Sequence, residues 1–147
     1  MDVSKLFSSA KINDQPPPAE LLNLPSIASA EDAYKALLDL RQFAQESPDR
    51  TAIWNRAAHV FDSIERWRNA LSPAEDERVC GHCIRGAAIS VLKEAQSRAH
   101  LLDAINNPLQ GFDGAEAAQE RMVESCRKGL AACMRVADLH LSNCRPG

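Results

Sequence analysis

The sequence predicts an all-α fold, a four-helix antiparallel bundle with a long C-terminal helical hairpin. Apolar residues recur three or four positions apart along most of the chain, which is the spacing of one buried helix face. Ser, Asp and Pro stand before these series, where helices begin. No segment alternates apolar and polar residues as a half-buried strand would. At 147 residues the chain has the size of one domain with its own core.

The first two helices are predicted on either side of Pro48. Ser29 precedes two acidic residues and an apolar series, the pattern of a capped helix. Pro48 ends that helix and starts the next, because Pro is unfavourable inside a helix but suits its first position. The apolar stripe of the second helix consists of Ile53, Trp54, Ala57, Phe61, Ile64, Trp67 and Leu71.

Two longer helices follow. The segment SPAE at 72–75 is a capping box, which predicts a third helix that runs to about Asn106. The segment DGAE at 113–116 predicts the start of the fourth helix, with Phe112 as a hydrophobic staple against Ala117. At 1.5 Å per residue, two helices of about 30 residues are each about 45 Å long. We therefore expect them to form one extended antiparallel hairpin.

The remaining residues, 1–28, are predicted to form an extended N-terminal arm outside the helical domain of 29–147. Three consecutive prolines at 16–18 fix φ and remove amide donors, so they do not form a helix. Leucines stand at 21, 22 and 24, and Leu6-Phe7 lies near the start. These apolar residues are expected to dock on the bundle or on a partner.

Charge and cysteine content narrow the cellular context. The formal net charge of −3 gives no field strong enough to predict a nucleic-acid or membrane partner. No apolar segment has the length of a signal sequence or a membrane span, so we expect a cytoplasmic protein. The five cysteines are an odd number, and in that compartment we expect reduced thiols or thiolate ligands rather than a disulfide framework.

The segment RVCGHCIRG at 78–86 carries the most distinctive chemistry of the chain. In a hairpin that turns near 106–113, Cys80 lies level with His140 and Cys83 lies a turn farther along. His140 and Cys144, four residues apart, share one helix face. Three thiolates and one imidazole are a donor set of closed zinc sites. We therefore predict that Cys80, Cys83, His140 and Cys144 hold a structural Zn²⁺.

Two other interpretations of these residues stay open. The cysteines can be core thiols, with Gly81 allowing close contact between helices. Alternatively, Cys80 and Cys83 form a thiol redox switch. Cys133 and His82 are substitute ligands, although His82 points to another side of a regular helix than Cys80 does.

The tetrapeptide CGHC at 80–83 matches the active-site sequence of the protein disulfide isomerases. The resemblance covers these four residues only, and Val79 stands where that family usually has Trp. No strand is predicted before the motif, whereas thioredoxin-like redox motifs follow a strand. We therefore do not assign the chain to that family.

No phosphate-binding loop, Ser/His/Asp set or EXXH di-iron pattern occurs, so we expect no enzyme activity. The expected function is that of a small adaptor or inhibitor acting through protein–protein contacts, and the chain could also form a homodimer.

The alternative is a nucleic-acid-associated subunit. Its candidate face consists of Arg56, Arg66 and Arg68 with Trp54 and Trp67, residues that ion pairs and core packing also explain.

Overall fold

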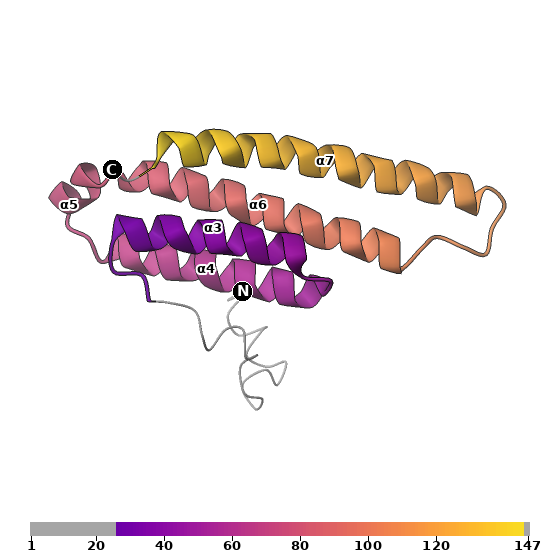
Figure 1. Ribbon diagram of the computed structural model, residues 1–147, viewed down its shortest axis with the longest axis horizontal. Helices are drawn as coiled ribbons and strands as arrows, with labels where there is room; N and C mark the ends of the chain where they lie inside the picture. The colour runs from indigo at the N-terminus through magenta and orange to yellow at the C-terminus, as the bar shows by residue number, and fades with distance from the viewer. Residues whose placement is uncertain (1–25, 146–147) are drawn as a thin grey trace, which may run out of the picture.

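The computed structural model describes residues 26–145, and its regular elements are all helices (Figure 1). They are α3 (Ala30–Glu46), α4 (Arg50–Asn69), α5 (Pro73–Arg78), α6 (Gly81–Asn106) and α7 (Ala115–Asn143). The all-α prediction is confirmed. The predicted count of four is wrong for 26–145, because the third predicted helix is divided between α5 and α6. Most of the predicted arm, 1–28, lies outside the described residues.

Side chains cap the first three of these helices as local chemistry predicts. The Ser29 hydroxyl accepts a hydrogen bond from the amide three residues on. Ser72 and Glu75 form the predicted capping box of α5. Helix α4 begins two residues after Pro48, because the Asp49 carboxylate accepts from the first free amides of the helix.

The start of α7 differs from the prediction. Gly114, with a φ of +81°, precedes the helix, and no side chain caps it. The predicted staple is also wrong, because Phe112 is 55% exposed. Gly111 has a φ of +88°, so the linker turns sharply through backbone conformations that favour glycine. These turns leave the Phe112 ring outside the core.

Helix α6 is the central element of the fold. It packs against α3, α4 and α5, and on its other side against α7 (Figure 1). The core between α3, α4 and α6 is built largely of Ala, Leu, Ile and Val, whereas α7 buries only Leu130, Ala137 and Leu141. Ile27, at the start of the described chain, also packs against this core. None of the described helices is long and apolar enough to cross a membrane.

One ion pair is buried inside this arrangement. The Arg41 guanidinium on α3 donates three hydrogen bonds of 3.2, 2.9 and 2.6 Å to the Glu94 carboxylate on α6, which is 1% exposed. Its third nitrogen lies 2.8 Å from an Asp138 oxygen on α7. The hydrogen bond to Glu94 raises the pKa of Arg41 above its ordinary value. Arg41 therefore links three helices through one charged group.

Removing the Arg41 charge should be strongly destabilising, because it leaves the Glu94 carboxylate buried without a partner. We expect Arg41→Met to lower the free energy of unfolding by about 3 kcal/mol, as measured by urea denaturation. The double variant Arg41→Met/Glu94→Met should recover much of this loss. Asp138→Asn is the matched control and should cost about 1 kcal/mol or less, because Asp138 is 63% exposed. Equal losses in all three variants would contradict this account.

Candidate thiol site at the start of helix α6

The break between α5 and α6 shapes the segment that carries the CGHC motif. Helix α5 ends at Arg78, and Cys80 adopts a left-handed conformation with a φ of 54°. Cys80 is the only residue other than glycine with a positive φ among 26–145. This conformation costs about 1 to 2 kcal/mol, so the surrounding contacts must hold it in place.

Gly81 explains why the chain bends at this point. The Arg68 guanidinium on α4 donates a 3.0 Å hydrogen bond to the Asp76 carboxylate on α5, and this pair lies directly against Gly81. A Cβ atom at Gly81 would overlap the Asp76 carboxylate and lie 3.0 Å from Arg68 Nε. The same hydrogen bond lowers the pKa of Asp76, so the carboxylate stays charged in this corner. A side chain at this position would therefore displace the ion pair.

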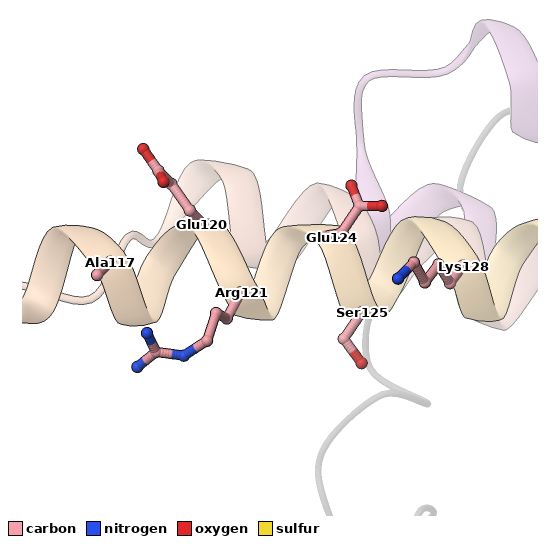
Figure 2. A pocket seen from close by; sticks show the side chains of 6 residues that line it. All are labelled: Ala117, Glu120, Arg121, Glu124, Ser125 and Lys128. Atoms are coloured by element: carbon pink, nitrogen blue, oxygen red, sulfur yellow. The ribbon is translucent and has the colours of Figure 1, made fainter.

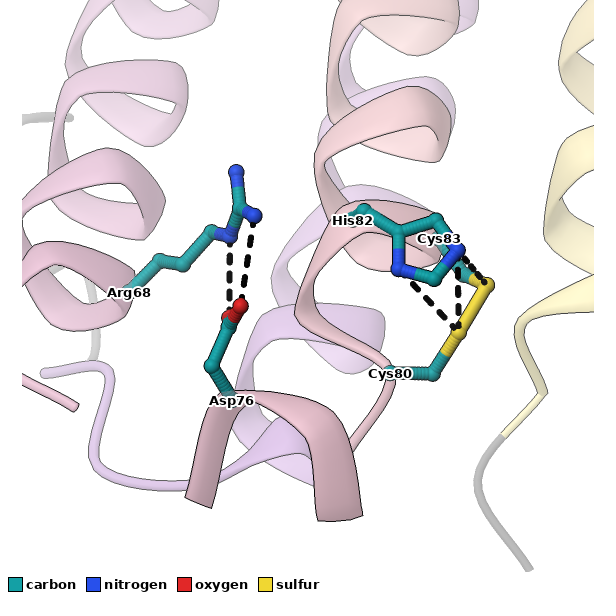
Figure 3. Close-up of a disulfide and its surroundings, with 5 residues drawn as sticks. All are labelled: Arg68, Asp76, Cys80, His82 and Cys83. Carbon is teal, nitrogen blue, oxygen red and sulfur yellow. Dashed lines mark hydrogen bonds and ion pairs between the residues drawn. A yellow bond between two sulfur atoms is a disulfide. The ribbon is translucent and has the colours of Figure 1, made fainter. Parts of the chain in front are cut away.

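Three soft donor groups come together beside this bend (Figure 3). Cys80 and Cys83 are joined by a disulfide, and their Cα atoms are 5.4 Å apart. The His82 Nε2 atom lies 3.6 Å from Cys83 Sγ and 3.9 Å from Cys80 Sγ. One ligand atom from each of these residues lies within 4.8 Å of the others, so the group could hold a metal ion. His82 is exposed and both cysteines are half-buried.

These positions correct two expectations from the sequence. Reduced thiols were expected, whereas Cys80 and Cys83 form a disulfide. His82 was expected on another side of a regular helix, but the left-handed backbone at Cys80 brings its ring over both sulfur atoms. The signal that reveals this is Gly81 directly after Cys80, because it marks a bend and not a continuous helix.

His140 and Cys144, the other two predicted zinc ligands, do not belong to this group of ligand atoms among the described residues. A Cβ at Gly86 would lie 3.0 Å from His140 Nδ1, so His140 faces Gly86 and not Cys80. The residues that face each other across the two helices of the hairpin are therefore shifted by about six positions from the prediction. The cause is the linker: the amide of Leu109 donates to Gln119 Oε1, so the chain continues beside α7 before it turns. The four-residue zinc site stays a prediction.

The remaining cysteines are free thiols on α7 or at its C-terminal end. Cys126, Cys133 and Cys144 are each half-buried. Cys144 packs against the hydrophobic core, and burial raises the pKa of its thiol. A raised pKa disfavours the thiolate, which is the form that binds metals and attacks disulfides. Cys144 is therefore a poor candidate for thiolate chemistry.

Two other surfaces of the molecule carry charged side chains. A shallow depression on α7 is lined by Ala117, Glu120, Arg121, Glu124, Ser125 and Lys128 (Figure 2). All six residues come from one helix, and Glu124 and Lys128 have the spacing of a solvent-exposed charge pair. This depression is the ordinary polar face of a helix.

The candidate nucleic-acid face has much of its positive charge engaged. Arg66 pairs with Asp62, Arg68 pairs with Asp76, and the Arg56 guanidinium lies 4.4 Å from the centre of the Phe43 ring. The two tryptophans differ: Trp67 packs against the core, whereas Trp54 is 38% exposed and contacts the His100 ring edge to face. The interpretation that placed both tryptophans in the core is therefore wrong for Trp54.

Comparisons with known proteins assign no relationship to this chain. No protein-family model, curated protein or solved structure matches it. The candidate site consequently rests on its own geometry.

Substitution of Gly81 tests the origin of the bend. Gly81→Ala should lower the free energy of unfolding by about 1 to 3 kcal/mol, because the added methyl group displaces the ion pair of Arg68 and Asp76. Gly129→Ala on α7 is the matched control, since no atom lies within 4 Å of its added Cβ. That variant should gain about 0.5 to 1 kcal/mol. Thermal and urea unfolding measure both, and a stabilised Gly81→Ala would refute the close contact.

Proposed function

We propose that this protein is a non-enzymatic helical protein whose Cys80, His82 and Cys83 form a thiol switch. The observation that carries the proposal is the position of two sulfur atoms and an imidazole within 4.8 Å of one another at a partly exposed helix start. In the oxidised state, Cys80 and Cys83 share a disulfide. Reduction adds two electrons and two protons from a dithiol reductant, breaks the S–S bond and leaves two thiols.

The helix start favours this chemistry for an electrostatic reason. Cys80 is the residue that precedes α6, and Cys83 is its third residue. Free amides and the helix dipole place partial positive charge there, which stabilises a thiolate. Arg68 and Asp76 neutralise each other at the back of the corner. The reduced thiols are therefore placed for both reoxidation and metal binding.

The reduced state is proposed to bind Zn²⁺ through Cys80, Cys83 and His82. Two thiolates and one imidazole leave a fourth position for water or a further ligand. The disulfide and the metal use the same sulfur atoms, so the two states exclude each other. The ligand set predicted from the sequence, with His140 and Cys144 in place of His82, is the competing proposal.

Counting thiols tests the switch. Protein exchanged into buffer without reductant should react with maleimide at three cysteines, and at five after treatment with a dithiol reductant. Cys126→Ser/Cys133→Ser/Cys144→Ser should change from zero to two reactive thiols. Intact-protein mass spectrometry measures the added mass. Five reactive thiols before reduction, in air-equilibrated buffer, would contradict the disulfide.

Zinc binding by the reduced protein separates the two ligand sets. We expect about one zinc per chain by elemental mass spectrometry after reduction and removal of free metal. Cys83→Ser and His82→Ala should lose it, whereas His140→Ala and Cys144→Ser should retain it. Loss of zinc in His140→Ala and its retention in His82→Ala would support the ligand set predicted from the sequence. A wild-type protein without zinc would restrict the site to redox chemistry.

Contact with another protein is a second candidate function, the adaptor or inhibitor role expected from the sequence. The observation that favours it is a group of exposed apolar side chains at the tip of the hairpin: Ile105, Leu109 and Phe112 are 46%, 38% and 55% exposed. Apolar residues gathered at one end of a molecule are typical of a binding surface. No observation favours nucleic acid over protein as the partner.

The hairpin tip should contribute little to stability if its apolar residues serve binding. Phe112→Ser should change the free energy of unfolding by about 0.5 kcal/mol or less, because the ring buries little area in the folded chain. Leu141→Ser, at a position that is 4% exposed on the same helical hairpin, should cost several times more. Urea denaturation measures both. A loss above about 1 kcal/mol in Phe112→Ser would restore its role as a hydrophobic staple.

A further inference from the structure

A cleft lies at the end of the bundle beside the thiol site, where the described chain begins. Its volume is about 360 Å³. Its lining combines the apolar residues Ala28, Ala30, Trp67, Leu71 and Val79 with the polar residues Ser29, Glu31, Glu75 and Arg78. The apolar residues come from the start of α3, the end of α4 and the bend before α6. Trp67, Leu71 and Val79 are all partly exposed. The cleft therefore leaves apolar area open to a ligand.

The start of the described chain lines one side of this cleft. Ile27 packs against the core, and the amide of Ala28 donates a 3.0 Å hydrogen bond to Asp32 Oδ2 on α3. These contacts hold the chain at the mouth of the cleft, because Ala28 is also one of its lining residues. Whatever precedes residue 26 starts from this fixed point.

The sequence immediately before that point is apolar. Leu21, Leu22 and Leu24 lie two to five residues before Ser26. At most about 3.5 Å of chain per residue gives them a reach of about 17 Å from that position. A segment tethered so closely has a high effective concentration at the cleft, so it outcompetes a free partner of similar affinity.

We infer that the cleft binds the chain's own leucines at 21, 22 and 24. Their side chains bury the exposed parts of Trp67, Leu71 and Val79, which is favourable by the hydrophobic effect. This contact gives the apolar residues before the helical domain a specific position beside the bend that carries Cys80. The inference is independent of the thiol switch, because it requires neither the disulfide nor a metal.

Trp67 reports on the occupancy of the cleft. In a Trp54→Phe background it is the only tryptophan of the full-length chain, since the sequence contains two. Leu21→Ser/Leu22→Ser/Leu24→Ser in that background should shift the emission of Trp67 to longer wavelength and increase its quenching by iodide. Leu6→Ser/Phe7→Ser is the matched control, because it removes apolar residues that lie farther from the cleft in sequence. The control should leave both signals unchanged.

A second substitution tests the contact from the side of the cleft. Val79→Ser should reproduce the increase in iodide quenching, and adding the three leucine substitutions to it should produce little further change. Far-ultraviolet circular dichroism confirms that each variant keeps its helical content. Unchanged Trp67 quenching in the triple leucine variant would overturn the inference and leave the cleft to another partner. An equal increase in the Leu6/Phe7 control would also overturn it.

Discussion

The contact of the Arg68 and Asp76 ion pair with the backbone of Gly81 determines the geometry of the candidate site. The pair joins α4 to α5 and leaves no room for a side chain where α6 begins. The chain therefore turns at Cys80 through a left-handed conformation instead of continuing as one helix. That turn places the His82 ring over both sulfur atoms. The Arg68 and Asp76 ion pair thus helps to arrange the three donor atoms of Cys80, His82 and Cys83, although it is not one of the donors itself.

The rest of the molecule supplies a rigid support for this corner. Arg41, Glu94 and Asp138 connect α3, α6 and α7, so the central helix is held by charge as well as by apolar packing. Burying Glu94 has a large desolvation cost, which its hydrogen bonds with Arg41 offset. The disulfide, in contrast to buried Glu94, lies on a half-exposed bend at the end of the bundle. A buried core and an accessible thiol pair therefore occupy separate parts of the fold.

Local chemistry predicted the helices well, and long-range contacts explain where prediction failed. Ser29 and the capping box at Ser72 act within one helical turn, so the sequence alone revealed them. The ion pair beside the break at Cys80 includes Arg68, which belongs to another helix. Because the local sequence does not contain this partner, the region resembles one regular helix. The level of His140 in the hairpin depends on the path of the linker at Leu109. The spacing of Cys80 and Cys83 identifies them from sequence, whereas a regular helix would make His82 only a substitute ligand.

Cys80 and Cys83 are proposed to interconvert between disulfide and dithiol, and their reduction potential tests this most directly. The triple variant without the other three cysteines can be equilibrated in dithiol redox buffers, with the oxidised fraction measured after acid quenching. A switch should have a potential above about −300 mV, within the range of cellular thiol couples. A potential well below about −300 mV would mark a permanent structural disulfide and contradict the claim.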